Sequence, residues 1–304
     1  MSNLTRRLIT AGVGIPLLFL ALFAYDGIAV PAVLLVLVVL LLWECSGLLQ
    51  LKHAGIRVLY AGIGGAAFFF VITISRETSL LVFGQASFNL NILLLSWFCA
   101  WTTLSSDMRE FWTSRKKKSS PHYPSEISTR ISSASRTAKF LLTVGCLLVL
   151  VSLCISFWGL YAHISPWILI YVLAVAWATD TGAYFAGHAF GKRPLAKRIS
   201  PKKTVEGTIG GCLLGWALAL IIGFWWIQPE FGWPKYGVIL VSISIPILAV
   251  CGDLFESVLK RISEAKESGS ILPGHGGLLD RIDSLVIAAP FTFAACILFG
   301  RYTQ

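Results

Sequence analysis

Long runs of apolar residues, separated by short polar segments, recur from one end of the 304-residue sequence to the other. The runs are continuous, whereas the strands of a membrane barrel alternate between apolar and polar positions. Because backbone groups in lipid must satisfy their own hydrogen bonds, such runs are expected to be helices. The pattern therefore predicts an all-α, multi-pass membrane protein with about nine transmembrane helices, at residues 8–25, 28–49, 58–75, 88–104, 139–157, 166–186, 206–227, 236–256 and 284–300.

The distribution of basic residues predicts how these helices are oriented. The sequence is 56% hydrophobic and only 13% charged, yet its net charge is +10. With a cytoplasmic N-terminus, all but three of the 25 Lys and Arg residues fall on cytoplasmic segments, the exceptions being Arg76, Lys235 and Arg301. Cytoplasmic loops are normally enriched in this way. We therefore expect an inner (cytoplasmic) cell membrane protein whose positive charge reflects topology and not nucleic-acid binding.

A polar segment divides the apolar runs into two groups. Residues 114–136 are basic and rich in Ser, without the periodicity of a helix or strand. This composition predicts an irregular loop that acts mainly as a solvated orientation signal. We therefore divide the chain into N-terminal transmembrane helices with a basic cytoplasmic loop, residues 1–138, and a C-terminal transmembrane region, residues 139–304, which we expect to be catalytic.

Four acidic residues lie within the apolar runs: Glu44, Asp180, Asp253 and Glu256. Acidic residues inside membrane spans are costly and usually line a protein interior or a wet cavity. All four are placed toward the cytoplasmic side by the predicted topology. The sequence therefore predicts a polar site at that side of the bundle.

Two further acids, Asp280 and Asp283, are three residues apart, so a helix would place them on one face. Together with Asp253 they could gather several carboxylate oxygens, the ligands that suit Mg²⁺ or Mn²⁺. No set of Cys and His residues has the spacing of a zinc site. The alternative is an interfacial salt-bridge network, in which these carboxylates pair with Lys260, Arg261 and Arg281.

The stretch "KRISPKKTVEGTIGG", residues 197–211, has the outline of a phosphate site. Ser200 followed by Pro201 fits the cap and first position of a helix. A helix N-terminus beside basic and hydroxyl side chains favours phosphate binding, and the stretch offers Lys202, Lys203 and Thr204. Glycines 207, 210 and 211 would allow close approach of backbone or of another helix. The alternative is a basic stop before a span that contains small packing residues.

A second stretch, "LPGHGGLLDR", is rich in glycine beside charged residues. Gly274, Gly276 and Gly277 give a backbone that can fold tightly around a ligand. His275 could donate to a phosphate or polarise a leaving group. Acids for a metal, lysines for phosphates and a glycine loop on one side of a bundle indicate phosphoryl or nucleotidyl transfer at the membrane surface.

Residues 257–284, "SVLKRISEAKESGSILPGHGGLLDRIDS", resemble the signature of phosphatidate cytidylyltransferases, also called CDP-diacylglycerol synthases. The matching positions are Ser257, Lys260, Arg261, Lys266, Pro273, His275, Gly276, Gly277, Asp280, Arg281 and Asp283. "DTGAYFAGHAFGK", "SPKKTVEG" and "GDLFES" are similar to other motifs of the family, in the same order. The similarity is clear over 180–284 and otherwise rests on hydropathy. Glu267 stands where the family usually has Asp, so we leave it out of the metal set.

The resemblance implies the reaction of CTP with phosphatidic acid, which yields CDP-diacylglycerol and pyrophosphate with the help of Mg²⁺. It is a step of phospholipid biosynthesis, and the lipid bilayer supplies the second substrate. The lipid phosphate would attack the α-phosphorus of CTP without a strong general base. A second, monovalent cation such as K⁺ and assembly as a homodimer are left open by the sequence.

The resemblance also implies roles for individual residues. Asp253 and Asp280 are expected to hold the metal, with Asp283 and Asp180 as further ligands or supporting acids. Residues expected to bind substrate are Ser200, Lys202, Lys203, Thr204, Gly276 and Gly277. Those expected to take part in catalysis are Asp280, Asp283, Lys260, Arg261, His275 and Arg281.

Two other functions are alternatives. A CTP-dependent polyprenol or phytol kinase would also be polytopic but would transfer the γ-phosphate, and the complete glycine-loop signature argues against it. A transporter of an anionic solute would place charges near the bilayer midplane and repeat one half of the chain in the other. The polar cluster lies instead at the predicted cytoplasmic ends, and the sequence has no clear internal repeat.

Overall fold

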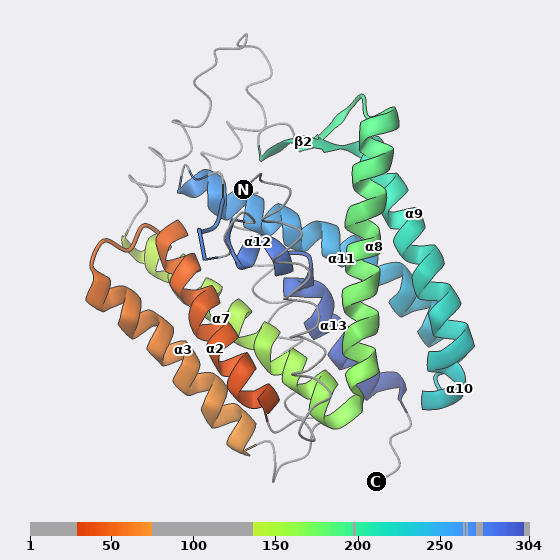
Figure 1. Cartoon of the computed structure of the whole chain (residues 1–304), viewed down its shortest axis with the longest axis horizontal. Coiled ribbons are helices and arrows are strands. Elements are labelled where there is room, and N and C mark those ends of the chain that lie inside the picture. Colours follow the sequence, from red (N-terminus) through yellow and green to blue (C-terminus); the bar gives the residue numbers. More distant parts are fainter. Residues whose placement is uncertain are drawn as a thin grey trace, which may run out of the picture.

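The computed structural model describes residues 29–74, 136–196, 199–263, 265, 267–271 and 276–300, with the backbone alone for residues 136–138 and 262. Most of these residues are helical (Figure 1). The predicted spans 8–25 and 88–104, and the loop residues 114–135, lie outside the described residues.

Six helical segments in the described part are long and apolar enough to cross a bilayer. They are α2 (Ala29–Leu48), α3 (Ala54–Ile74), α7 (Arg136–Gly159) with the π-helical turn η2 (Leu160–Ile164), α8 (Pro166–Phe190), α9 (Val205–Ile222) with η3 (Gly223–Ile227) and α10 (Gln228–Phe231), and α11 (Lys235–Ile262). Each confirms one predicted span. The protein is thus an all-α, multi-pass membrane protein, while the number nine and the orientation stay predictions.

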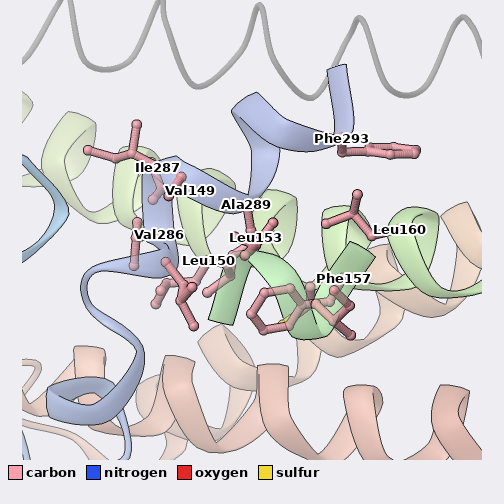
Figure 2. Close-up of a cluster of buried hydrophobic side chains, with 14 of the residues drawn as sticks. Val149, Leu150, Leu153, Phe157, Leu160, Val286, Ile287, Ala289 and Phe293 are labelled. Atoms are coloured by element: carbon pink, nitrogen blue, oxygen red, sulfur yellow. The ribbon is translucent and has the colours of Figure 1, made fainter. Parts of the chain in front are cut away.

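The last predicted span is a helix, but a short one. α13 (Leu285–Phe299) has 15 residues, fewer than the roughly 20 that cross the hydrocarbon core. It lies inside the bundle, where it packs against α7 and α11. Figure 2 shows the core between α7, η2 and α13, formed by Val149, Leu150, Leu153, Phe157, Leu160, Val286, Ile287, Ala289 and Phe293.

Close packing of α8 against α9 depends on glycine, as the sequence predicts. A Cβ added at Gly210 would overlap Ala186 Cβ, and one added at Gly211 would lie 2.5 Å from the carbonyl oxygen of Thr179. The backbones of these helices therefore approach more closely than larger side chains would permit.

The predicted helix start at Ser200 and Pro201 is wrong. Residues Ser200–Thr204 form a strand, β2, which pairs with β1 (Pro194–Ala196) in an antiparallel hairpin. A residue before proline is pushed toward extended backbone, and proline is tolerated on an edge strand. α9 begins five residues later, at Val205, and is capped by Thr204, whose Oγ1 accepts from Gly207 N at 3.1 Å.

The hairpin and the short helix α12 (Leu279–Ile282) lie toward one end of the bundle, and α10 lies toward the other (Figure 1). Glu206 joins the hairpin to α9, because its carboxylate accepts from the backbone N–H groups of Lys192 and Arg193 at 3.1 Å each and from Arg193 Nε at 2.9 Å. This end of the bundle therefore carries the polar segments that the sequence analysis singled out.

Candidate active site

Three carboxylates from separate elements form an acidic trio: Asp180 of α8, Asp253 of α11 and Asp283, which follows α12. Burial, together with the nearby charges of Asp253 and Asp180, raises the pKa of Asp283 from 3.8 to about 7. Close approach of α11 depends on Gly252, because an added Cβ there would overlap the carbonyl oxygen of Asp283. The three carboxylates therefore lie near enough to disfavour one another's negative charge.

Lys203 connects the hairpin to the acidic trio. Its Nζ forms an ion pair with Asp253 Oδ2, and both side chains are largely buried. Ser257, one turn further along α11, donates to the other oxygen of Asp253 at 3.4 Å. Lys202, the preceding strand residue, is exposed. The strand therefore presents one lysine to the acids and one to solvent.

A second cluster, the Asp280 network, lies beside the trio. Asp280 Oδ1 accepts from Lys260 Nζ at 2.7 Å, and Oδ2 accepts from the N–H groups of Ser268 at 2.9 Å and Gly277 at 3.0 Å. Lys260 also lies 2.5 Å from Glu256 Oε2. Burial alone would raise the pKa of Asp280, but its neighbours Glu256 and Lys260 and the Ser268 N–H lower it to about 2.

Glu44 of α2 reaches the same segment from the N-terminal half of the chain. Its side chain is buried. Oε1 accepts from Leu278 N at 2.9 Å, and Oε2 accepts from Leu279 N at 2.9 Å and from the Ser268 hydroxyl at 3.3 Å. A carboxylate from one end of the sequence thus holds the backbone of the signature stretch near the other end.

The glycine stretch folds tightly, as predicted, at the positions that the structure describes. Gly276 has a φ of 82°, which a residue with a side chain rarely adopts. At Gly277 an added Cβ would overlap Ser268 Oγ and lie 2.7 Å from Gly269 N. Gly274 and His275 lie outside the described residues. Ligand binding by this turn stays a prediction.

The remaining predicted site residues have varied surroundings. Arg261 Nε donates to the carbonyl oxygen of Ile199 at 2.8 Å, so it links the end of α11 to the hairpin. Arg281 is exposed, and Ser200 lies half-buried at the start of β2. The salt-bridge alternative is partly realised: Lys260 pairs with Glu256 and Asp280, whereas Arg261 bonds a backbone carbonyl.

The four predicted metal ligands fall into two groups. Asp180, Asp253 and Asp283 belong to the acidic trio, while both oxygens of Asp280 are engaged by Lys260 and by backbone N–H groups. Within the described ranges, no three Asp, Glu, His or Cys residues have the arrangement of a metal site. The structure therefore brings the acids together as neighbours without gathering them into a coordination shell.

Three contributors to this region were not assigned to the site from sequence. Of the three, the sequence marked only Glu44 and Glu256 as unusual positions, since each is an acid within an apolar run. Nothing in the sequence indicated their partners. Ser268 carried no such signal. Its hydroxyl accepts from Asp280 N at 3.2 Å and donates to Glu44, contacts that exist only in the folded chain.

Comparison with known proteins gives a consistent result. A profile of the Cytidylyltransferase family matches residues 5–299. Three relatives, all named phosphatidate cytidylyltransferase, come from Haemophilus influenzae, Bacillus subtilis and Staphylococcus haemolyticus. They are 47% identical over 125 residues, 42% over 132 and 40% over 147, which cover 41%, 43% and 48% of this chain. The matches span 43%, 48% and 55% of the relatives, so the chain aligns with about half of their length.

Proposed function

Because the chain belongs to the cytidylyltransferase family, we propose that it is a nucleotidyltransferase that converts CTP and phosphatidic acid into CDP-diacylglycerol and pyrophosphate. Relatives named phosphatidate cytidylyltransferase support this substrate pair. An oxygen of the lipid phosphate attacks the α-phosphorus of CTP, and the bond from that phosphorus to the β-phosphate oxygen breaks. Phosphomonoesters are nucleophilic near neutral pH, so the protein need not supply a strong base.

The observation that carries this proposal is the meeting of Lys203 with the acidic trio. Two highly anionic substrates must be brought together, and phosphoryl chemistry of this kind depends on positioning and charge stabilisation. Lys203 offers positive charge from the hairpin at the point where carboxylates converge from α8, α11 and the end of α12. Lys202 extends the positive charge along the same strand.

The acidic trio fits Mg²⁺ by its chemistry. Carboxylate oxygens are the preferred protein ligands of this ion, which usually binds one or two of them together with substrate phosphates. The charges of Asp253 and Asp180 already raise the pKa of Asp283, and a cation would relieve that repulsion. We assign Asp253, Asp283 and Asp180 to this role; when bound, Mg²⁺ would neutralise negative charge on the phosphates.

Asp280 has a different role in this proposal. Its oxygens hold Lys260 and the backbone of the glycine turn, so it orders the turn and orients Lys260. Asp280→Asn keeps the shape of the side chain but replaces one acceptor with a donor. We expect this variant to fold and to lose activity by orders of magnitude in the cytidylyl-transfer assay.

Other predicted residues would bind phosphates around this centre. Arg281 is exposed beside Asp280, and His275 belongs to the same signature stretch. Gly276 and Gly277 would bring backbone close to a ligand. Ser200 and Thr204 belong to the hairpin strand that carries Lys203, and Thr204 also caps α9. Arg261 binds the hairpin turn and so supports the same strand.

The setting is a multi-pass membrane protein, and we propose the inner cell membrane with the site at the cytoplasmic side. That orientation rests on the bias of basic residues. It places the site at the headgroups, where phosphatidic acid carries its reacting phosphate.

The deciding experiment uses purified protein in detergent micelles with phosphatidic acid, Mg²⁺ and CTP labelled with ³²P at either the α- or the γ-position. We expect α-label in the lipid phase and γ-label in pyrophosphate. γ-Label in an added polyprenol would identify a kinase instead. Absence of turnover with either label would contradict cytidylyl transfer and favour uptake assays for a transporter.

Two variants complete this experiment. Asp253→Asn removes one charge of the acidic trio and should lower the rate at least roughly 100-fold, as expected when charge stabilisation of a transferring phosphate is lost. Glu230→Gln is the matched control, because Glu230 is an exposed acid in α10, at the other end of the bundle. Equal loss in both variants would contradict the assignment of Asp253.

A further inference from the structure

We propose that Glu44 is a positioning residue of the catalytic centre: its carboxylate fixes the glycine turn and α12, and thereby sets where Asp280 and Asp283 lie. The inference rests on the proposed cytidylyl transfer. It concerns a residue of α2, which belongs to the N-terminal transmembrane helices and not to the region expected to be catalytic.

Among the described residues, the hydrogen bonds to the Glu44 carboxylate all come from one segment. Its two oxygens accept from Leu278 N, Leu279 N and the Ser268 hydroxyl, at 2.9, 2.9 and 3.3 Å. Leu278 and Leu279 are where α12 begins, and α12 has no side-chain cap of its own. The first N–H groups of a helix need acceptors from elsewhere. Glu44 supplies them from another helix.

A carboxylate is required for these contacts because every partner is a donor. Hydrogen bonds to a charged acceptor are shorter and about twice as strong as neutral ones. Glu44 is only 4% exposed, and a buried charge without such partners would be strongly unfavourable. In the described part of the chain these hydrogen bonds, and not an ion pair, meet its charge. A glutamine would turn a donor toward one of the N–H groups.

Two glycines of the surrounding backbone lie close against this carboxylate. A Cβ added at Gly269 would lie 2.5 Å from Glu44 Oε1, and one added at Gly277 would lie 2.9 Å from Glu44 Oε2. Both glycines belong to the segment that Glu44 holds. The turn therefore closes around the Glu44 side chain.

Glu44 is connected to the acids of the site through Ser268. The Ser268 hydroxyl donates to Glu44 and accepts from Asp280 N, while Ser268 N donates to Asp280 Oδ2. Asp283 follows α12 directly. A shift of Glu44 would therefore move Asp280 through one intervening residue, and Asp283 through the four-residue helix between them.

The test compares Glu44→Gln with Glu44→Asp, Ser268→Ala and a control, Ser46→Ala. Ser46 lies in the same helix and is also buried, but its hydroxyl bonds Trp43 and Arg57, away from the signature stretch. For each purified variant we would measure kcat, KM for CTP, the Mg²⁺ concentration for half-maximal rate, and the thermal midpoint. Amide hydrogen exchange at residues 276–284 gives a readout independent of activity.

We expect Glu44→Gln to lower kcat/KM roughly 10- to 100-fold, the usual effect of losing a residue that orients ligands. Half-maximal rate should need more Mg²⁺, and the amides of Leu278 and Leu279 should exchange faster. Glu44→Asp should recover part of each property. Ser268→Ala should change them in the same direction but less, which keeps the test decisive if Glu44→Gln folds poorly. Ser46→Ala should alter only the thermal midpoint.

Two results would overturn the inference. One is a folded Glu44→Gln protein with wild-type kinetics and exchange. The other is a loss of rate that only follows the folded fraction, with unchanged Mg²⁺ dependence and unchanged exchange at Leu278 and Leu279. Failure of the proposed function is distinguishable, because the wild-type protein would then transfer no cytidylyl group. The exchange measurement would still test whether Glu44 fixes the glycine turn and α12.

Discussion

Single acidic side chains near α12 each hold several groups, so their substitution should have large effects. Asp280 accepts from one lysine and two backbone N–H groups, and Glu44 accepts from two others and a serine. A buried donor that loses its acceptor costs more than an exposed one, since water cannot replace the lost partner. Effects at these positions should therefore far exceed those at exposed acids such as Glu230.

Asp283 should give the metal-free protein a pH-dependent stability. Burial, with the charges of Asp253 and Asp180, raises its pKa from 3.8 to about 7. The unfolded chain loses this proton at lower pH than the folded protein, so this residue's contribution to the free energy of unfolding falls as pH rises from about 4 to 7 and is then constant. Thermal unfolding with EDTA across this pH range measures it.

The matched variant for that measurement is Asp283→Asn, which removes the titrating group and keeps the size of the side chain. The difference in stability between wild type and variant should change with pH below about 7, in the direction that penalises the wild type as pH rises. Curves that stay parallel would contradict the raised pKa of Asp283.

Gly277→Ala should prevent the turn from closing. An added Cβ would overlap Ser268 Oγ and lie 2.9 Å from Glu44 Oε2, so the turn would have to move away from both. We expect activity to fall at least roughly 100-fold, because a displacement of about 1 Å at a catalytic site has effects of that size. Gly62→Ala in α3 is the control, since nothing lies within 4 Å of its added Cβ; similar losses in both variants would contradict the account.

The base of the hairpin β1–β2 is held by Glu206, which binds the backbone of Lys192 and Arg193. Glu206→Ala removes these contacts and should let Lys203 move away from Asp253. Because Lys203 is assigned to phosphate binding, we expect KM for CTP to rise about threefold to tenfold, the range that loss of one or two net hydrogen bonds allows. Steady-state kinetics measures this change.

Thr204→Ala distinguishes the effect of the α9 cap from the effect of the Glu206 contacts. It removes the cap of α9 and should lower the thermal midpoint, since a lost N-cap costs on the order of 1 kcal/mol, while the Glu206 contacts remain. A KM for CTP that is unchanged in Glu206→Ala would show that the base of the hairpin does not position Lys203.

Hydropathy predicted the described helices well because an apolar run of the right length is sufficient to specify a membrane helix. It predicted residues 28–49 and 166–186, for example, and the helices are Ala29–Leu48 and Pro166–Phe190. The cap at Ser165, followed by Pro166, uses the same Ser-Pro pattern that was wrongly expected at Ser200. Local sequence does not distinguish these two uses.

The acids of the site were recognised from sequence as costly charges in apolar runs, but their partners were not. The donors that Glu44 binds are 234 and 235 positions away in the sequence, so no local pattern could pair them. Likewise, the sequence does not show that the carboxylates form two groups, one around Asp253 and one around Asp280. That division depends on how α11 and α12 pack.

The two halves of the chain form one structure around this site. α2 and α3 pack against α7 on one side, α7 packs against α13, and α11 contacts α9 and α13 on the other side (Figure 1). Glu44, from the N-terminal half, binds the backbone of the signature stretch. A protein lacking α2 should therefore be inactive even if the remaining helices insert.

The orientation of the chain is testable by labelling. The bias of basic residues predicts that residue 119, in the basic loop, faces the cytoplasm and that Lys235, the first residue of α11, faces outward. In intact cells a membrane-impermeant maleimide should label Lys235→Cys above the wild-type background and should label Ser119→Cys only after the cells are opened. The reverse pattern would invert the proposed topology.

The most direct test of cytidylyl transfer follows oxygen atoms. Phosphatidic acid is prepared with ¹⁸O in its phosphate and incubated with the protein, Mg²⁺ and unlabelled CTP. The ¹⁸O content of each product is then measured by mass spectrometry. If the lipid phosphate attacks the α-phosphorus, CDP-diacylglycerol retains all of the ¹⁸O and pyrophosphate contains none. Labelled pyrophosphate, or the absence of a cytidylylated lipid in an otherwise folded and CTP-binding protein, would contradict the proposed reaction.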